Sequence, residues 1–212
     1  MAIIHVPFLN EVHMQMPVTE VSERLDQQKK YDINIAPWAD YPYKPLVSFT
    51  IAYSADCIVI KYYVAEKSVK ATYYQSNDPV YKDSCVEFFV SFGEKGYYNF
   101  ELNCIGTCLA AFGPNRYERT FLPVDIIQKI KSVSQIYRED RSGVIQWQLM
   151  VMLPFDVFMH DSLSDLKGKT AKANFYKCGD DLPQPHYLCW NNISSPQPDF
   201  HLPQFFGSVQ FA

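Results

Sequence analysis

The 212-residue sequence predicts an all-β protein, an antiparallel β-sandwich with one or a few short helices. From residue 46 onward, short apolar segments follow one another at close spacing. They are separated by Gly, Asn, Asp, Ser and Pro, and the helical patterns between them are too short for a βαβ fold. Tyr and Phe, which fill strands well, occur 15 times each, and this composition also favours strands.

The first 44 residues are expected to be irregular, apart from one short helix. Val18, Val21 and Leu25 share one face of that helix, because apolar residues three and four apart meet on the same side. Three prolines in "APWADYPYKP" then hold the chain in extended or turn geometry.

Strand patterns fill the rest of the chain. The expected strands span residues 46–54, 57–66, 69–75, 84–92, 97–103, 107–113, 132–140, 143–153, 171–179 and 207–212. Residues 121–131 and 161–168 are each expected to form a turn or two of helix. No internal repeat or linker interrupts the pattern. We therefore expect a single domain over residues 1–212, with residues 1–44 packed on the sandwich as an N-terminal segment.

The charge pattern excludes several classes of partner. The net charge is −4 and no block of basic residues is present, which argues against nucleic acid, whose binding needs clustered Lys and Arg. No apolar run approaches the roughly 18–20 residues that cross a bilayer, so no membrane partner is expected. The N-terminus "MAIIHVPFLN" lacks the features of a secretory signal. We expect a cytoplasmic protein, or a periplasmic or extracellular one if a leader has been removed.

The cysteines are expected to be reduced, buried thiols. No Cys-x-x-Cys pair occurs, and no second pair with zinc spacing follows Cys104 and Cys108. A free cysteine within a strand pattern is usually a small buried hydrophobe. The six are Cys57, Cys85, Cys104, Cys108, Cys178 and Cys189.

Metal, haem and hydrolase patterns are weak. Loop aspartates are suitable calcium ligands but lack EF-hand spacing; they are Asp78, Asp83, Asp180 and Asp181. Side chains of the kind that ligate haem are present without a spacing that demands it; they are Met150, Met152, His186 and His201. No Gly-x-Ser-x-Gly motif supports a serine hydrolase.

Period-two alternation assigns side chains to the two faces of the sheet. In "GVIQWQLMVML", Trp147 lies on the all-apolar face and is expected in the core. In "SCVEFFVSF", Val86 and Phe88 face the core and Glu87 faces the other way. The loop "GEKG" joins this strand to "YYNFELN" as a hairpin. That hairpin gathers polar side chains on one face, namely Glu87, Asn99, Glu101 and Asn103.

Three interpretations of this polar face stay open. It can be the solvated face of an antiparallel sheet, which is polar by default. It can bind sugar, because Tyr81 lies six residues before Glu87, and sugars favour flat aromatic rings beside carboxylates and amides. It can also belong to a glycoside hydrolase, since Glu87 and Glu101 on neighbouring strands can reach the separations that such enzymes use.

The C-terminal segment from residue 174 to 211 is an aromatic, proline-rich loop followed by a strand. Prolines between Pro183 and Pro198 exclude helix and central strand. Trp190 in this loop either packs over the sheet or offers a stacking face. His201, between two apolar residues, is either a ligand or a hydrogen-bonded structural residue.

The blocks "NDPVYKDSCVEFFVSF", "YYNFELNCIGT" and the tail "W…PDFHLPQFFGSVQF" resemble carbohydrate-binding module family 9 and its stand-alone relatives. The resemblance covers roughly residues 45 to 212. It implies a β-sandwich of the immunoglobulin-like or DOMON-like kind that binds carbohydrate without catalysis. The expected ligand is the end of a glucose- or xylose-type glycan held between two aromatic rings. The resemblance requires no cofactor, and calcium in this family is structural.

Residue by residue, the resemblance implies a sugar clamp. Its Asp-x-x-x-Glu pattern falls on Asp83 and Glu87, which makes Glu87 the hydroxyl-binding carboxylate. The aromatic residues of the clamp fall on Tyr81, where the binders have Trp, and on Trp190. The arginine that the family places on the next strand is replaced here by Glu101. The expected ligand-binding set is completed by Glu101 and Asn103, with no catalytic residue.

Overall fold

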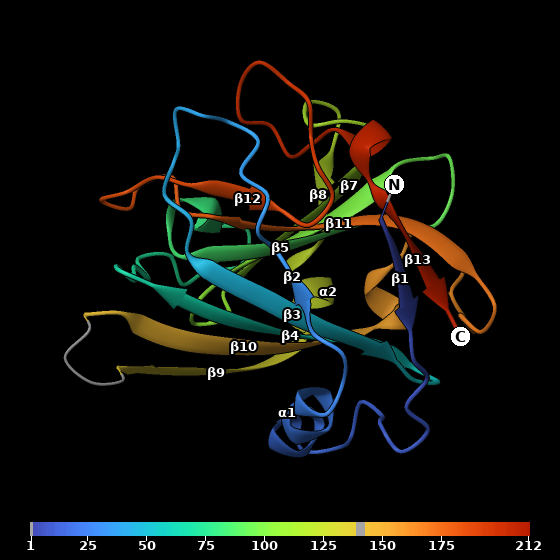
Figure 1. Ribbon diagram of the computed structural model, residues 1–212. Coiled ribbons are helices and arrows are strands. Elements are labelled where there is room, and N and C mark those ends of the chain that lie inside the picture. Colours follow the sequence, from blue (N-terminus) through green and yellow to red (C-terminus); the bar gives the residue numbers. More distant parts are fainter. Residues whose placement is uncertain (1, 139–142) are drawn as a thin grey trace.

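The computed structural model describes residues 2–138 and 143–212, and two β-sheets packed face to face form its body (Figure 1). This architecture confirms the predicted β-sandwich. The eight-stranded sheet of the described chain has the order β1-β13-β11-β5-β6-β7-β8, with β12 paired to β11. Its strands are β1 (Ile3–Val6), β5 (Cys85–Ser91), β6 (Tyr97–Asn103), β7 (Cys108–Gly113), β8 (Thr120–Phe121), β11 (Thr170–Cys178), β12 (Tyr187–Cys189) and β13 (Gly207–Phe211).

The second sheet has the order β2-β3-β4-β10-β9. Its strands are β2 (Tyr31–Asp32), β3 (Leu46–Tyr53), β4 (Cys57–Glu66), β9 (Lys131–Arg138) and β10 (Ile145–Pro154). The helices are α1 (Val18–Asp26) and the single turn α2 (Val124–Ile127), with 3₁₀ turns η1 (Val80–Lys82), η2 (Phe155–Val157) and η3 (Pro203–Phe205). Within the described residues, no helix combines the length and apolar character needed to span a bilayer.

Two of the expected elements are absent. Residues 69–75 do not form a strand, because the amides of Thr72 and Tyr73 donate to the buried carboxylate of Asp83 and not to a neighbouring strand. Residues 161–168 form turns and no helix, and the amide of Gly168 bonds to the end of β13. Residues 139–140 of the expected strand at 132–140 lie outside the described part of the chain.

The main core fills the space between the two sheets. Val86, Phe88 and Val90 of β5 face inward, as the alternation predicts, and pack among the inner residues of β10. Trp147 lies in this core with no exposed surface, which confirms its predicted place. The predicted hairpin is also correct, since β5 and β6 pair antiparallel with Glu87 opposite Glu101.

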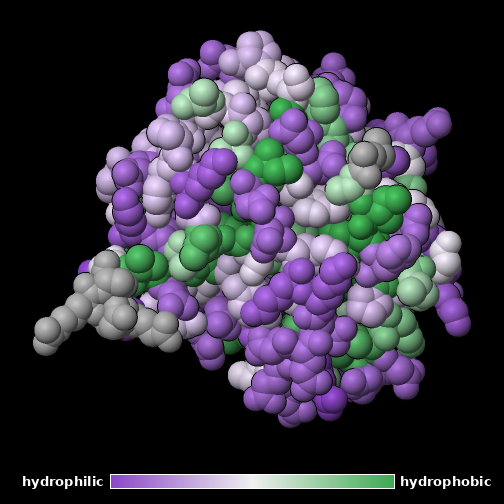
Figure 2. Space-filling view, in the orientation of Figure 1, coloured by the Kyte–Doolittle hydropathy of each residue, from purple (hydrophilic) through white to green (hydrophobic). Residues whose placement is uncertain are grey.

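The N-terminal segment is more regular than expected. β1 pairs in parallel with β13, so the first and last strands of the chain lie side by side (Figure 1). Helix α1 buries Val21 and Leu25 against the outer face of the five-stranded sheet, over Met150 and Met152. Its other side is polar, and hydrophilic side chains gather over this region in Figure 2.

A second apolar cluster covers the outer face of the eight-stranded sheet. Phe89 and Tyr176 from the sheet pack there against Trp38 of the N-terminal segment and against Ile193 and Phe200 of the C-terminal loop. The face that carries Glu87 is therefore covered by two distant segments of the chain. The interpretation as a solvated face is wrong, because the alternation of a strand says which face a side chain takes but not what covers it.

Candidate functional site

Two glutamates lie side by side beneath this covering. Glu87 of β5 and Glu101 of β6 are directly opposite in the ladder, and only 3% and 2% of their surfaces are exposed. The Oε1 atom of Glu87 accepts the Cys178 thiol at 3.1 Å. The Oε1 atom of Glu101 accepts the side-chain amide of Asn99 at 3.1 Å. A pair of carboxyl groups this deeply buried needs a positive partner.

Arg119 is that partner. Its Nη1 atom lies 3.2 Å from Oε1 of Glu101, and its side chain is 16% exposed. The segment that carries Arg119 passes so close to β7 that a Cβ atom on Gly113 would lie 2.4 Å from the Arg119 Cα atom. Only glycine allows that approach. The guanidinium that the family resemblance places on β6 thus comes from the segment before β8.

His201 completes the charged group as a neutral side chain. Arg119 donates to its Nε2 atom at 2.9 Å, and its Nδ1 atom lies 2.9 Å from the Tyr97 hydroxyl. Burial, and after it the cations Arg119 and Arg116, lower the pKa of His201 to about 2. His201 therefore orients the guanidinium and adds no charge to the pocket.

The carboxyl groups are electrostatically coupled. Burial, and after it the charge of Glu101, raises the pKa of Glu87 well above its usual range. Burial raises the pKa of Glu101 to about 7, although Arg119 acts in the opposite direction. Burial also raises the pKa of the neighbouring Asp180 to about 6. Because two adjacent buried carboxylates repel each other, the pair carries less than two full negative charges near neutral pH.

These groups line a pocket that opens between the covering loops. Its volume is about 110 Å³, well above the ~10–15 Å³ that one water needs. The lining combines three aromatic rings with carboxyl and guanidinium groups, and comprises Tyr81, Glu87, Glu101, Arg116, Arg119, Cys178, Asp180, Tyr187, Pro198, Asp199, Phe200 and His201. Such a lining suits a small ligand with flat apolar faces and several hydroxyl groups.

The pocket contains three of the five expected ligand-binding residues: Tyr81, Glu87 and Glu101. Asn103 is buried and holds a turn instead. Its amide group donates to the Tyr73 carbonyl and to Asp83, and its carbonyl oxygen accepts the amides of Ile105 and Thr107. With these bonds made, Asn103 has a structural role at the end of β6.

Trp190 is also elsewhere, since the pocket lining found in the described chain does not include it. Its ring packs against the main core, edge-on to Phe175 with the ring centres 5.8 Å apart. A Cβ atom on Gly207 would lie 2.3 Å from the indole, so the ring rests directly on the backbone of β13. Tyr187, which sequence reasoning missed, lines the pocket together with Tyr81.

The packing of Trp190 leads to a prediction. We expect Trp190→Ala to lower the free energy of unfolding by about 2–4 kcal/mol, somewhat less than a fully buried aromatic ring contributes. Sugar affinity should stay the same, because the indole does not reach the pocket. Denaturant unfolding measures the change in stability, and calorimetric titration measures the sugar affinity. Replacement of the exposed Tyr74 by Ala is the control. A Trp190→Ala variant with wild-type stability but reduced sugar affinity would show that Trp190 belongs to the sugar clamp.

The side chains of the kind that ligate haem do not converge on one site. Met150 and Met152 lie beneath α1 on the outer face of one sheet, while His201 lies in the pocket outside the other. His186 contacts Lys177. Among the described residues, no cluster of aspartates suits calcium, and the one group able to converge on a metal is Cys85, Glu87 and Cys178. Structural calcium stays a prediction.

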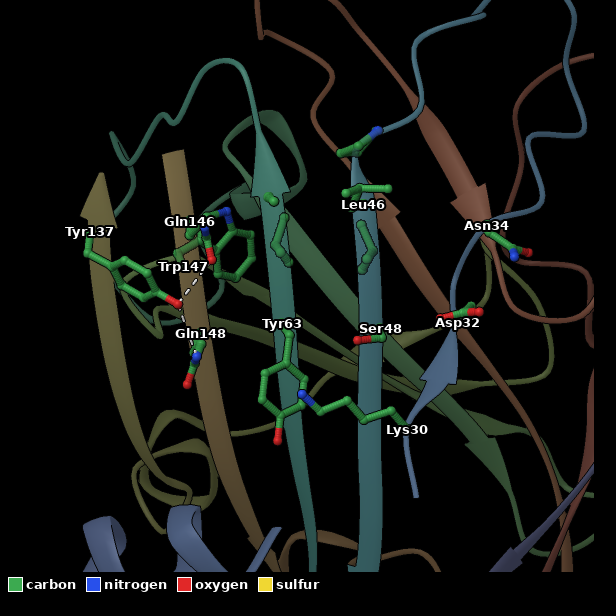
Figure 3. Close-up of a pocket in the computed structure, with 14 residues that line it drawn as sticks. Lys30, Asp32, Asn34, Leu46, Ser48, Tyr63, Tyr137, Gln146, Trp147 and Gln148 are labelled. Atoms are coloured by element: carbon green, nitrogen blue, oxygen red, sulfur yellow. Dashed lines mark hydrogen bonds between the residues drawn. The ribbon is translucent and has the colours of Figure 1, made fainter. Parts of the chain in front are cut away.

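A larger recess of about 500 Å³ lies on the outer face of the five-stranded sheet (Figure 3). Several of its polar groups are paired with one another. Tyr137 lies within hydrogen-bonding distance of Gln146 and Gln148 on β10. The Lys30 ammonium lies 3.7 Å from the centre of the Tyr63 ring and covers it. Despite its size, this recess gathers no buried carboxyl group, so the smaller pocket is the better candidate.

Comparison with known proteins assigns the chain to a family. A family model described as carbohydrate-binding family 9 matches residues 18–211. A crystal structure of a protein from Bacteroides uniformis ATCC 8492, provisionally described as carbohydrate-binding, is 38% identical; the match covers 99% of both chains with a TM-score of 0.92. No protein with a curated description matches.

Two more distant structures share the fold. Both are family 9 carbohydrate-binding modules from Caldicellulosiruptor kristjanssonii. The complex with glucose is 10% identical, covers 100% of this chain and 96% of that chain, and has a TM-score of 0.66. The complex with cellotriose is 11% identical, covers 99% and 93%, and has a TM-score of 0.63. At these identities the likeness concerns the fold alone.

Proposed function

Because the chain belongs to carbohydrate-binding family 9, we propose that it binds carbohydrate without cleaving it, in the pocket formed by Glu87, Glu101 and Arg119. The observation that carries the proposal is this buried group of two carboxyls and one guanidinium beneath a rim of aromatic rings. The matched solved structures, two of them complexes with glucose and cellotriose, support the same class of ligand.

The ligand is the end of a glucose- or xylose-type glycan. Carboxyl oxygens of Glu87 and Glu101 accept from sugar hydroxyls, and Arg119 donates to a sugar oxygen. Tyr81 and Tyr187 supply the apolar surface for the C–H faces of the ring. The small volume and the covering loops favour one terminal sugar unit over the middle of a chain.

Calorimetric titration tests the proposal. Glucose, cellobiose, cellotriose and xylobiose are titrated into the protein, together with their reduced alcohols. We expect saturable binding by at least one sugar, weakened when its terminal ring is opened by reduction. Tyr81→Ala and Tyr187→Ala should each lower the affinity about 5- to 150-fold, corresponding to about 1–3 kcal/mol for a lost aromatic anchor.

Tyr137→Ala is the matched control, since it removes a tyrosine from the recess on the other sheet. Binding lost in this control but kept in the two pocket variants would move the site to that recess. Binding by none of the sugars would overturn the proposal. Chromatography of each mixture tests the alternative of a glycoside hydrolase using Glu87 and Glu101. Release of a shorter sugar, abolished by Glu87→Gln, would make the protein an enzyme.

A further inference from the structure

The base of the pocket holds three potential metal ligands on one face of the sheet. Cys85 of β5 and Cys178 of β11 are directly opposite each other in the ladder. Glu87 lies two residues along β5 from Cys85, so its side chain emerges on the same face. The two sulfur atoms and a carboxylate oxygen lie within 4.8 Å of one another, and all three residues are buried.

This spacing is close to what a tetrahedral site needs. Zinc binds cysteine sulfur at about 2.3 Å and carboxylate oxygen at about 2.0–2.2 Å, which places two ligating sulfurs about 3.8 Å apart. The Cys178 sulfur is already 3.1 Å from Oε1 of Glu87, held there through its thiol hydrogen. Replacement of that proton by a metal ion needs only a small movement of the side chains. Cys85 begins β5 and Cys178 ends β11, and the two are paired in the ladder, which holds the backbones of these ligands in place.

We propose that Cys85, Glu87 and Cys178 form a binding site for a thiophilic divalent cation of the zinc or cadmium type, with its fourth position open to the pocket. Two sulfurs and one oxygen favour such a cation over calcium or magnesium, which take oxygen ligands. Glu87 and Cys178 line the pocket while Cys85 lies behind them. The free position therefore faces the space that a ligand oxygen or a water can reach.

The metal ion replaces the thiol protons of this cluster, and its charge offsets the negative charges that result. Both thiols lose their protons to solvent when the ion binds, because the thiolate is the ligand. The charge of the ion offsets the two thiolates, which would otherwise be costly to bury. Glu87 coordinates through the oxygen that now accepts the thiol, and its other oxygen remains for the pocket.

Metal titration of the full chain tests this site without any sugar. The protein is reduced beforehand with a phosphine, so that a disulfide between the two thiols cannot mask the site. We expect one zinc ion per chain by elemental analysis after gel filtration, and a thiolate-to-cobalt charge-transfer band when cobalt replaces zinc. Calcium should not compete for the site.

The variants Cys85→Ser and Cys178→Ser should each weaken zinc binding by more than about 100-fold, since even outer-shell changes cost 10- to 100-fold. Glu87→Gln should weaken binding while the cobalt–thiolate band persists. Cys189→Ser is the matched control, because this buried cysteine belongs to the same outer cluster but bonds to Ile35. Circular dichroism shows which variants fold. A single folded variant of a proposed ligand is enough to test the site.

Absence of the cobalt–thiolate band in the reduced wild-type protein would overturn the proposal. An unchanged band in Cys85→Ser would do the same. Because sugar binding is measured separately, the failure of either proposal leaves the other standing.

Discussion

Replacement of Lys177 by methionine is expected to lower the free energy of unfolding by about 3–5 kcal/mol, as does the removal of one partner from a buried ion pair elsewhere. For a chain of this size, that loss corresponds to a melting temperature lower by about 6–20 °C. This loss exceeds the one expected for Trp190→Ala.

The reason is an ion pair that joins the two sheets with no contact with solvent. Lys177 of β11 lies 3.0 Å from Oε2 of Glu66 on β4, and neither side chain has exposed surface. The other oxygen of Glu66 accepts the indole N–H of Trp147 at 2.7 Å. Lys177 also donates to the Cys178 carbonyl and to Nε2 of His186. Methionine would leave the carboxylate buried without its cation.

His186 is part of this arrangement as a neutral acceptor. Burial, and after it the charge of Lys177, lowers the pKa of His186 to about 3. Its 3.7 Å approach to Glu66 is therefore not an ion pair. The Oε2 atom of Glu66 has no well-aligned hydrogen bond, so its compensation is the 3.0 Å charge contact with Lys177. Lys177 is thus the sole cation paired with this carboxylate among the described residues.

Denaturant unfolding measures the effect, and Lys129→Met is the matched control. Lys129 pairs with Asp156 at 3.1 Å, but both side chains are well exposed, so its loss should cost less than about 1 kcal/mol. Adding Glu66→Gln to Lys177→Met should recover a large part of the loss, because Gln keeps an acceptor for Trp147 without a buried charge. Equal stability of the two lysine variants would show that the buried pair contributes no more than a surface one.

Strand periodicity was sufficient to predict the centre of the candidate site. It placed Glu87 on the face opposite Phe88, and the hairpin loop brought Glu87 and Glu101 together, as the structure confirms. Periodicity depends only on neighbours along the strand, so it could not predict the covering of that face. Trp38 and Phe200, more than 150 residues apart in the chain, close over the carboxyl groups.

Arg119 and Trp190 show why the rest of the site was not predictable. Arg119 precedes a strand of two residues, too short to leave a pattern, and reaches Glu101 only because Gly113 lacks a side chain. The direction of the Trp190 ring depends on Gly207 in the same way. Both outcomes result from close approaches between separate segments, which sequence spacing does not report. The sequence did contain one clue to this arginine: the predicted polar face carried two glutamates and no basic residue to pair with them.

Replacement of Arg119 by glutamine is expected to lower sugar affinity by about 30-fold or more, corresponding to the ~2–5 kcal/mol that truncation of a buried, hydrogen-bonded charge costs at an interface. The neutral amide cannot replace the guanidinium, which at once pairs with Glu101, bonds to His201 and faces the pocket. Arg119→Lys should restore only part of the affinity, because an ammonium cannot present the planar fork of donors.

Calorimetry with the best-binding sugar measures this loss, and Arg24→Gln is the matched control. Arg24 lies on α1, beyond the opposite sheet, and makes an exposed ion pair with Glu11 at 3.5 Å, so its variant should bind like the wild type. Thermal unfolding shows whether the Arg119 variants are folded at the titration temperature. A folded Arg119→Gln protein with wild-type affinity would mean that the guanidinium only neutralises Glu101. Sugar recognition would then rest on the carboxyl groups and the aromatic rim.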